Sequence, residues 1–326
     1  MKKNLLLTLF TAMLVMFLAA CGSDNTEEAS NERAETKTES EQAAAEPEEL
    51  TIKHDLGEAV VQKNPETVVV FDFGALDILD KLGVEVDGVP QGGTFPKYLS
   101  KFAGEEYENV GSLKEPDFEA IYGMEPDLIL ISGRQSAAYE ELNKIAPTVF
   151  VGVDNAKYME SFTHNVNTLA EIFGKEAEAE TELAKINEAI DSLKAVTAAD
   201  DKKGLVTLTT GGKLSAYGPG SRFGILHDVF GVKPADENIE ASTHGMSVTF
   251  EYIAETNPDY LFVVDRDAVV EGNGTAADMF DNELVNKTNA AKNGKIIYLD
   301  PALWYIAGGG LTSVAQQVAE IEAALK

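Results

Sequence analysis

The chain has 326 residues, enough for about two domains, and its composition of 44% hydrophobic and 25% charged residues is that of a globular protein. Acidic residues outnumber basic ones 55 to 26, and the resulting net charge of −29 repels phosphate backbones, so we exclude nucleic acid as a partner. The single cysteine, Cys21, excludes an internal disulfide and a zinc site built from cysteines.

The first residues are predicted to be a targeting segment. Lys2 and Lys3 precede an apolar run, Leu5–Leu18, which is too short to span a bilayer as a stable helix. Small residues then stand directly before Cys21, as in a bacterial lipobox. We therefore expect a signal peptide over 1–20 and a lipid-anchored cysteine, since two acyl chains suffice for stable anchoring. An ordinary secretory signal with a chance cysteine is the alternative.

The next segment, 21–49, is predicted to be a disordered acidic tether that begins at the lipidated Cys21. Residues 22–49 hold ten acidic and two basic residues and almost nothing apolar to bury. Such a composition repels itself and extends. The mature protein is thus expected on the extracellular face of the cytoplasmic membrane.

From residue 50 onward, short apolar runs alternate with helical patterns, which is typical of an α/β fold with parallel sheets. Strands are expected at Thr67–Phe71, Leu128–Ser132, Thr148–Val151, Leu205–Leu208, Tyr260–Val264 and Lys295–Leu299. Helices are expected around Leu76–Leu82, up to Leu142, over Ile225–Phe230 and after Gly308–Gly310. We predict two lobes, 50–157 and 199–326.

A helical segment, 158–198, is predicted to join the lobes, with a break near Gly174. Its apolar residues recur at spacings of three and four, the period of an amphipathic helix. They are Leu183, Ile186, Ile190, Leu193 and Val196. A stiff helical link and a cleft between two lobes follow from this pattern.

The two halves also contain a repeated segment. Residues 119–134 align without a gap on residues 251–266, with Glu, Ile, Pro, Asp and Arg at the same positions. The last matching pair is Arg134 and Arg266, each placed just after a predicted strand. This supports two related lobes.

The arginines are the candidate ligand-binding residues. Ligands of parallel α/β sheets bind beyond the carboxyl ends of strands, where Arg134 and Arg266 are expected, and Arg222 lies in a glycine-rich turn between a strand and a helix. A guanidinium offers charge, a two-pronged hydrogen bond and stacking. In a body this acidic, three converging arginines predict a pocket for an anion, unless each pairs with a local acid such as Asp265 or Asp267.

His244 and Tyr305 carry groups that bind ferric iron well. His244 lies in a run without helical period and Tyr305 follows the single tryptophan, Trp304. The sequence contains no GxSxG, HExxH or Walker A pattern, so we do not expect an enzyme.

Several segments of the chain, including those that carry the arginines and His244, resemble class III substrate-binding proteins of ABC importers. The resemblance is to the subgroup for ferric catecholate siderophores and is closest to the Gram-positive petrobactin-binding lipoproteins. The resemblance rests on residues 69–77, 109–117, 131–135, 217–222 and 242–245 and extends from about residue 50 to the end. It implies two Rossmann-like lobes joined by one long helix, with the ligand between them. It also implies a ferric siderophore as ligand, no intrinsic cofactor, an ABC permease as partner and a monomer.

The resemblance also assigns roles to residues of this chain. Three arginines that clamp the iron–catecholate anion match Arg134, Arg222 and Arg266. A histidine and a tyrosine that complete iron coordination by a tetradentate siderophore match His244 and Tyr305. A further basic contact matches Lys114. Separately from the resemblance, the aromatic side chains of Tyr217 and Trp304 are expected to supply apolar walls for a ligand with flat faces. Surface glutamates that dock on the permease match Glu119 and Glu251.

Other functions stay open at this point. The same scaffold could carry haem or cobalamin with His244 as an axial ligand. A secreted enzyme that uses His244, or an adhesive lipoprotein with an empty cleft, are further alternatives.

Overall fold

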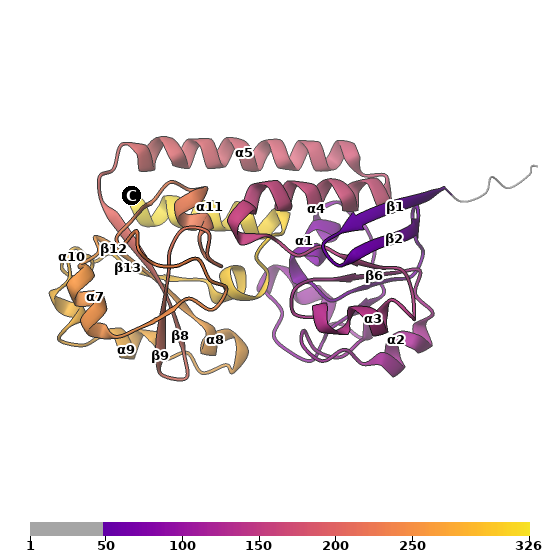
Figure 1. Ribbon diagram of the computed structural model, residues 1–326, viewed down its shortest axis with the longest axis horizontal. Coiled ribbons are helices and arrows are strands. Elements are labelled where there is room, and N and C mark those ends of the chain that lie inside the picture. Colours follow the sequence, from indigo (N-terminus) through magenta and orange to yellow (C-terminus); the bar gives the residue numbers. More distant parts are fainter. Residues whose placement is uncertain (1–47) are drawn as a thin grey trace, which may run out of the picture. The chain divides into compact units, whose positions relative to one another are not determined.

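The computed structural model describes residues 48–326, and two α/β lobes with a helical link carry its regular structure (Figure 1). The predicted signal peptide, the lipidation site at Cys21 and nearly all of the predicted tether lie outside the described residues. The first strand, β1, already begins at Glu49, the last residue assigned to the tether. The described part belongs to one compact unit.

The first lobe is built on a fully parallel sheet of five strands in the order β5-β4-β3-β6-β7. The strands are β3 (Val68–Val70), β4 (Gly88–Val89), β5 (Glu108–Asn109), β6 (Leu128–Ile131) and β7 (Thr148–Phe150). The helices are α1 (Phe73–Lys81), α2 (Phe118–Met124) and α3 (Tyr139–Leu142), with 3₁₀ turns at Lys97–Ala103, Ser136–Ala138 and Asn155–Lys157. Every residue of β3 and β6 is buried, as expected for strands covered on both faces.

The second lobe holds a mixed sheet in the order β11-β9-β8-β12-β13, with β10 also paired to β8. The strands are β8 (Lys203–Thr210), β9 (Lys213–Tyr217), β10 (Lys233–Pro234), β11 (Met246–Val248), β12 (Tyr260–Asp265) and β13 (Ile296–Leu299). The helices are α6 (Ile225–Asp228), α7 (Phe250–Thr256), α8 (Arg266–Val270), α9 (Ala276–Phe280), α10 (Asn289–Lys292) and α11 (Leu311–Leu325), with a 3₁₀ turn at Val285–Lys287.

Two hairpins were not predicted from the sequence. Strand β1 (Glu49–His54) pairs antiparallel with β2 (Gly57–Gln62), and β8 pairs antiparallel with β9. Gly211 and Gly212 connect β8 to β9 with φ of 53° and 74°, the left-handed region that a tight hairpin turn requires. The α/β class with parallel-rich sheets is confirmed, and antiparallel pairs are added at the edge of the second sheet.

The sequence repeat is also a structural repeat. Helices α2 and α7 begin 132 residues apart, each after a capping side chain, Asp117 or Thr249, that accepts an amide of the first turn. Both helices end on a left-handed residue, Glu125 (φ 50°) and Asn257 (φ 47°), before a Pro-Asp pair. Strands β6 and β12 follow at the same offset. The repeat therefore places Arg134 and Arg266 at matching positions beyond two strand ends.

The link between the lobes consists of α4 (Tyr158–Phe173) and α5 (Glu176–Ala198). They are separated at Gly174, whose φ of 61° ends α4 as predicted. Helix α5 packs against α4 and also against α11. The predicted apolar stripe of α5 is buried as far as Leu193, but Val196 is 39% exposed, and in the last turn it is Thr197 that is buried and donates to the Phe230 carbonyl.

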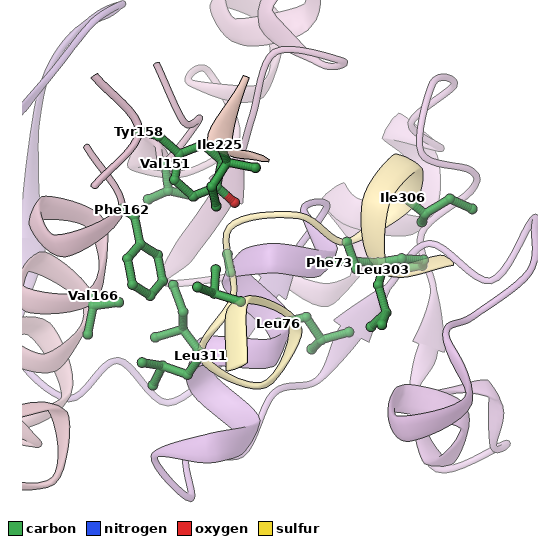
Figure 2. Packing of buried hydrophobic residues seen from close by; sticks show 14 of the residues in the cluster. Phe73, Leu76, Val151, Tyr158, Phe162, Val166, Ile225, Leu303, Ile306 and Leu311 are labelled. Atoms are coloured by element: carbon green, nitrogen blue, oxygen red, sulfur yellow. The ribbon is translucent and has the colours of Figure 1, made fainter. Parts of the chain in front are cut away.

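The end of the chain completes the core of the first lobe. Helix α11 packs against α1, and Figure 2 shows Leu311 of α11 and Leu76 of α1 in one cluster with Phe162 of α4. The buried carboxylate of Asp77 in α1 accepts the backbone amides of Thr312 and Ser313 at 2.9 and 2.7 Å. Asp77 thus caps the amino end of α11 by accepting two of its free amides.

The glycines before α11 allow this close crossing. A Cβ on Gly310 would lie 2.1 Å from an Asp77 carboxylate oxygen, and Gly309 has φ of 90°. The Gly308–Gly310 run therefore lets the chain pass directly against α1. Among residues 48–326, no helix has the length and apolar character needed to cross a membrane.

Candidate functional site

A cavity of about 290 Å³ lies where the two lobes meet, beyond the carboxyl ends of β6 and β12. We call it the outer cavity. The first lobe contributes two loops and Arg134, and the second lobe contributes Arg266, an apolar ledge on α8 and the turn that carries Tyr305. Its lining comprises Phe73, Pro90, Gly92, Gly93, Thr94, Ser112, Leu113, Lys114, Glu115, Arg134, Arg266, Val269, Val270, Tyr305 and Ile306.

Arg134 is held in the turn that follows β6. The buried side chain of Gln135 accepts the backbone amide of Ser132 at 3.0 Å and donates to the carbonyl of Leu113. This residue therefore ties the arginine turn to the neighbouring loop that carries Lys114. Arg134 itself donates to the carbonyl of Tyr305 at 2.7 Å, across the boundary between the lobes.

Arg222 lies in the loop between β9 and α6. The loop is fixed by Asp228, whose carboxylate accepts the Gly220 amide at 2.6 Å. The Arg222 guanidinium donates to the Tyr305 carbonyl at 2.7 Å and its Cζ lies 4.1 Å from the centre of the Tyr305 ring. Burial, assisted by the like charge of Arg134, lowers the pKa of Arg222.

Arg266 begins α8 and is the arginine with acidic neighbours. It pairs with Asp267 at 3.1 Å and with Glu271 at 3.2 Å. Its Nε donates to the Tyr305 hydroxyl at 3.2 Å. Burial acts to lower the pKa of Arg266, but the hydrogen bonds to Tyr305 and Glu271 outweigh it and the pKa is raised. The alternative of a local ion pair thus holds for Arg266, whereas no carboxylate of residues 48–326 forms an ion pair with Arg134 or Arg222.

All three arginines meet at Tyr305. This residue stands in a π-helical turn, Ala302–Ile306, a rare geometry that is frequent at functional sites. Burial acts to raise the pKa of the Tyr305 phenol, but the charges of Arg222 and Arg266 outweigh it, so the pKa is lowered. The turn presents a phenol with raised acidity and a carbonyl that already binds two guanidinium groups.

The Tyr305 turn also separates the outer cavity from a second one. The inner cavity, of about 100 Å³, shares Arg134, Tyr305 and Ile306 with the outer cavity. Arg222 lines the inner cavity and not the outer one. The predicted convergence of three arginines is therefore realised around Tyr305, with Arg222 on the far side of the turn.

Two predicted contact residues lie deeper than expected. Tyr217 is 2% exposed because its ring packs against Phe223 and its hydroxyl donates to the carbonyl of His244 at 3.0 Å. Burial raises the pKa of Tyr217 to about 12. Trp304 is 4% exposed, and its indole donates to Glu320 at 2.7 Å. Tyr217 supports the His244 loop, and Trp304 lines the inner cavity only.

The remaining predicted residues are exposed. Lys114 lines the outer cavity. His244 lines neither cavity, so the structure does not bring it together with Tyr305 as a pair of iron ligands. Glu119 and Glu251 stand in the first turns of α2 and α7 with exposed side chains.

Metal binding by protein side chains alone finds no support in the described part of the chain. Residues 48–326 contain no group of three or more His, Cys, Asp or Glu side chains arranged to hold a metal ion. What the site offers chemically is cationic hydrogen-bond donors, a phenol and apolar walls. This set suits an anionic ligand with flat faces.

Sequence reasoning missed three groups that shape the site. These are Gln135, which positions Arg134, Glu271, which pairs with Arg266, and the π-helical turn around Tyr305. Asp267 was named from the sequence as a possible partner because it adjoins Arg266, and the structure confirms that ion pair.

A family of periplasmic binding proteins matches residues 57–303, and the chain belongs to it. As this description says, the family consists of binding proteins and not of enzymes. The fold and the inter-lobe site thus define a substrate-binding protein of this class.

Several individual relatives are siderophore-binding proteins by name, which narrows the class of similar proteins further. The chain is 48% identical to the petrobactin-binding protein YclQ of Bacillus subtilis, over 100% of both chains. The YclQ crystal structure matches with a TM-score of 0.84 and 52% identity over 86% of this chain and 99% of that one. The ferric-anguibactin-binding protein FatB of Vibrio anguillarum is 36% identical over 81% of this chain and 84% of its own. The catecholate-siderophore-binding protein VctP of Vibrio cholerae matches with a TM-score of 0.81 and 38% identity, over 85% of this chain and 100% of that one.

Proposed function

We propose that this protein captures a ferric catecholate siderophore of the petrobactin type and delivers it to an ABC importer. The observation that carries the proposal is the meeting of Arg134, Arg222 and Arg266 at Tyr305, where the first two form no ion pair with any described carboxylate. The similarity to YclQ, FatB and VctP supports a ferric siderophore as the ligand.

The chemistry of such a ligand fits the site. Ferric catecholate complexes are anionic and have flat π faces, and a guanidinium can donate to the catecholate oxygens and stack on the ring. Val269 and Val270 supply an apolar ledge, with Val270 46% exposed. A nanomolar complex corresponds to about 12 kcal/mol, which three arginines and buried aromatic area can provide without covalent chemistry.

In this proposal the Tyr305 turn moves away from Arg134 and Arg222 when the ligand enters. The outer cavity, about 290 Å³, is at the lower end of the range for small-molecule sites. In this proposal the ligand's oxygens replace the Tyr305 carbonyl as the partner of Arg134 and Arg222. The Tyr305 phenol completes iron coordination when the siderophore supplies four ligand atoms, and Lys114 adds a basic contact at the rim. His244 lines neither cavity and joins the iron in this proposal only after its loop moves toward Tyr305.

For delivery, the protein is proposed to be held at the membrane by its amino-terminal segment. Residues 1–20 would be removed, Cys21 would carry the lipid, and residues 21–49 would tether a monomeric body whose lobes are 50–157 and 199–326, joined by 158–198. Cys21→Ala tests the anchor: the variant should be released into the medium, and retention on the membrane would contradict it.

Tryptophan emission gives the test of ligand class. Trp304, the single tryptophan, lies next to Tyr305 and lines the inner cavity. Protein lacking residues 1–21 is titrated with ferric petrobactin, a ferric hydroxamate and haemin. We expect saturable quenching at nanomolar concentration by the catecholate complex alone. Equal or tighter binding of haemin would favour the haem alternative, and no binding of any of the three by calorimetry would contradict the proposal.

A further inference from the structure

The inner cavity has features that the proposed siderophore site does not use. It lies behind the Tyr305 turn, between α4 and the second lobe, and encloses about 100 Å³. Figure 2 shows Tyr158 of α4 beside Ile225 of the second lobe, and both residues line this cavity. A cavity needs about 10–15 Å³ to hold one water molecule, so this cavity has room for an ion of several heavy atoms.

Two buried side chains that line the inner cavity have polar atoms without partners. No acceptor within the described residues takes the proton of the Tyr158 hydroxyl, and no donor reaches the Gln317 Oε1, although Tyr158 is 7% exposed and Gln317 only 2%. The amide nitrogen of Gln317 donates to the Leu303 carbonyl at 3.1 Å, which fixes its oxygen as the free acceptor. Burial raises the pKa of Tyr158, opposed by the Gly309 amide, so the hydroxyl keeps its proton and can donate it.

Such atoms point to a ligand because buried polar groups are nearly always paired. Only two other buried side-chain atoms of residues 48–326 lack a partner, on His54 and Thr209, and neither residue lines this cavity. The pair at Tyr158 and Gln317 therefore marks this cavity out from the rest of the described core.

The charges around the cavity favour an anion. Arg134 and Arg222 both line it, and both donate to one neutral acceptor, the Tyr305 carbonyl. The single carboxylate in the lining is Asp72, and one of its oxygens accepts the Ala75 amide as the cap of α1. Two positive charges and one negative charge leave a balance that a monoanion neutralises.

We propose that the inner cavity binds a small oxyanion that also carries a hydroxyl group, such as hydrogen carbonate or dihydrogen phosphate. Arg222 and the Tyr158 hydroxyl donate to its oxygens, and its own hydroxyl donates to Gln317. The hydroxyl is required because Gln317 offers an acceptor, which an anion without a proton cannot satisfy. This site goes beyond the proposed siderophore function and does not require it, although Arg222 contributes to both ligands and the two therefore compete when both are present.

Purified full-length protein without siderophore is titrated with hydrogen carbonate and, separately, with inorganic phosphate, at constant ionic strength in an anion-poor buffer. Trp304 lines the cavity and reports occupancy by its emission. We expect a saturable change with one or both oxyanions and none with chloride, which has no hydroxyl. The two oxyanion titrations distinguish the two sources of this chemistry.

The decisive variant is Tyr158→Phe, with Tyr139→Phe as its matched control. Tyr139 is a buried tyrosine of the first lobe that lines neither cavity. Tyr158→Phe should weaken the oxyanion at least fivefold, and Tyr139→Phe should leave its affinity unchanged. Oxyanion should also raise the melting temperature of the wild type and not that of Tyr158→Phe, since a ligand stabilises only the state that binds it.

Three results would overturn the proposal. They are a response that grows linearly without saturation, an equal response to chloride, which would indicate an adventitious ion only, and an unchanged oxyanion affinity in Tyr158→Phe. Titration with ferric petrobactin keeps the two proposals apart. Tyr158→Phe should bind it within twofold of the wild type, so failure of the siderophore site leaves this test intact.

Discussion

The helix–strand unit 117–134 of the first lobe and the unit 249–266 of the second agree in their caps, their left-handed helix ends and their strands. They differ in what surrounds the arginine at the end of each. Arg134 reaches across to backbone carbonyls of the other lobe, at Tyr305 and Ile306. Arg266 reaches Tyr305 as well but also pairs with two acids of its own helix region.

This difference shows that a repeated fold unit positions a side chain without setting its charge environment. The backbone of both units delivers an arginine to the same edge of a parallel sheet. The neighbours then decide whether the guanidinium is available to a ligand. Arg134 has no acidic partner among residues 48–326, whereas Arg266 forms ion pairs with Asp267 and Glu271.

Removing each arginine in turn should give the largest effect and the clearest contrast. We expect Arg134→Ala and Arg222→Ala to weaken ferric-siderophore binding about tenfold to a hundredfold, or about 1.5–3 kcal/mol, as for loss of a charged hydrogen bond. Arg266→Ala should cost only about threefold to tenfold because its charge is partly neutralised already. Calorimetric titration measures all three, and equal losses at Arg134 and Arg266 would remove the contrast. Arg134→Lys, which keeps the charge without the fork, serves as the control.

The pH at which the Tyr305 phenol ionises gives a second way to compare the arginines around it. Because nearby arginine charges lower its pKa, the phenolate should form at lower pH in the folded protein than in the unfolded chain, where the value is about 10. Between these two pKa values, the contribution of Tyr305 to stability rises with pH, and it is lost as pH falls through the folded pKa.

Ultraviolet absorbance of the wild type minus Tyr305→Phe measures this ionisation. Arg222→Ala should move it to higher pH more than Arg134→Ala does, since Arg222 stacks on the ring and Arg134 binds the carbonyl. A Tyr305 phenol that titrates above 10 in the wild type would contradict the prediction.

Removing one acidic partner of Arg266 should make its charge more available to a ligand, as the charge of Arg134 is. Glu271→Gln removes one acid from the Arg266 pair and frees its charge, so ferric-siderophore binding should tighten about twofold to fivefold, in the range of a surface ion pair. Glu283→Gln, at an exposed glutamate paired with Lys287 away from the cavities, is the matched control. Weaker binding in Glu271→Gln would mean that this acid positions Arg266 and does not compete for it.

The smallest effect on the purified protein is expected at Glu119 and Glu251. Both are exposed in the first turns of α2 and α7, away from the outer cavity. Glu119→Ala and Glu251→Ala should bind ferric siderophore as the wild type does but impair iron uptake by cells. A loss of affinity in either purified variant would argue against permease docking.

The sequence predicted what local patterns encode. Strand runs, the break at Gly174 and the repeat that ends at Arg134 and Arg266 all depend on residues close together in the chain, and the structure agrees with each. The hairpin turn at Gly211–Gly212 had a local signal that was overlooked.

What could not be predicted depends on contacts distant in sequence. Tyr217 and Trp304 looked like ligand contacts because of their neighbours in the chain, but their burial is set by Phe223, the His244 loop and Glu320. The link from Arg134 to Tyr305 spans 171 residues. No sequence pattern reports such a distance.

The capping of α11 by Asp77 has a consequence for how the chain acquires its structure. The first lobe lacks part of its core, and Asp77 lacks its amide partners, until residues 311–325 are present. Synthesis from the amino end therefore cannot complete the first half while the second is still being made. The nascent polypeptide can close the core of its first lobe only after its final segment has emerged from the ribosome, so folding of this lobe follows synthesis and does not accompany it.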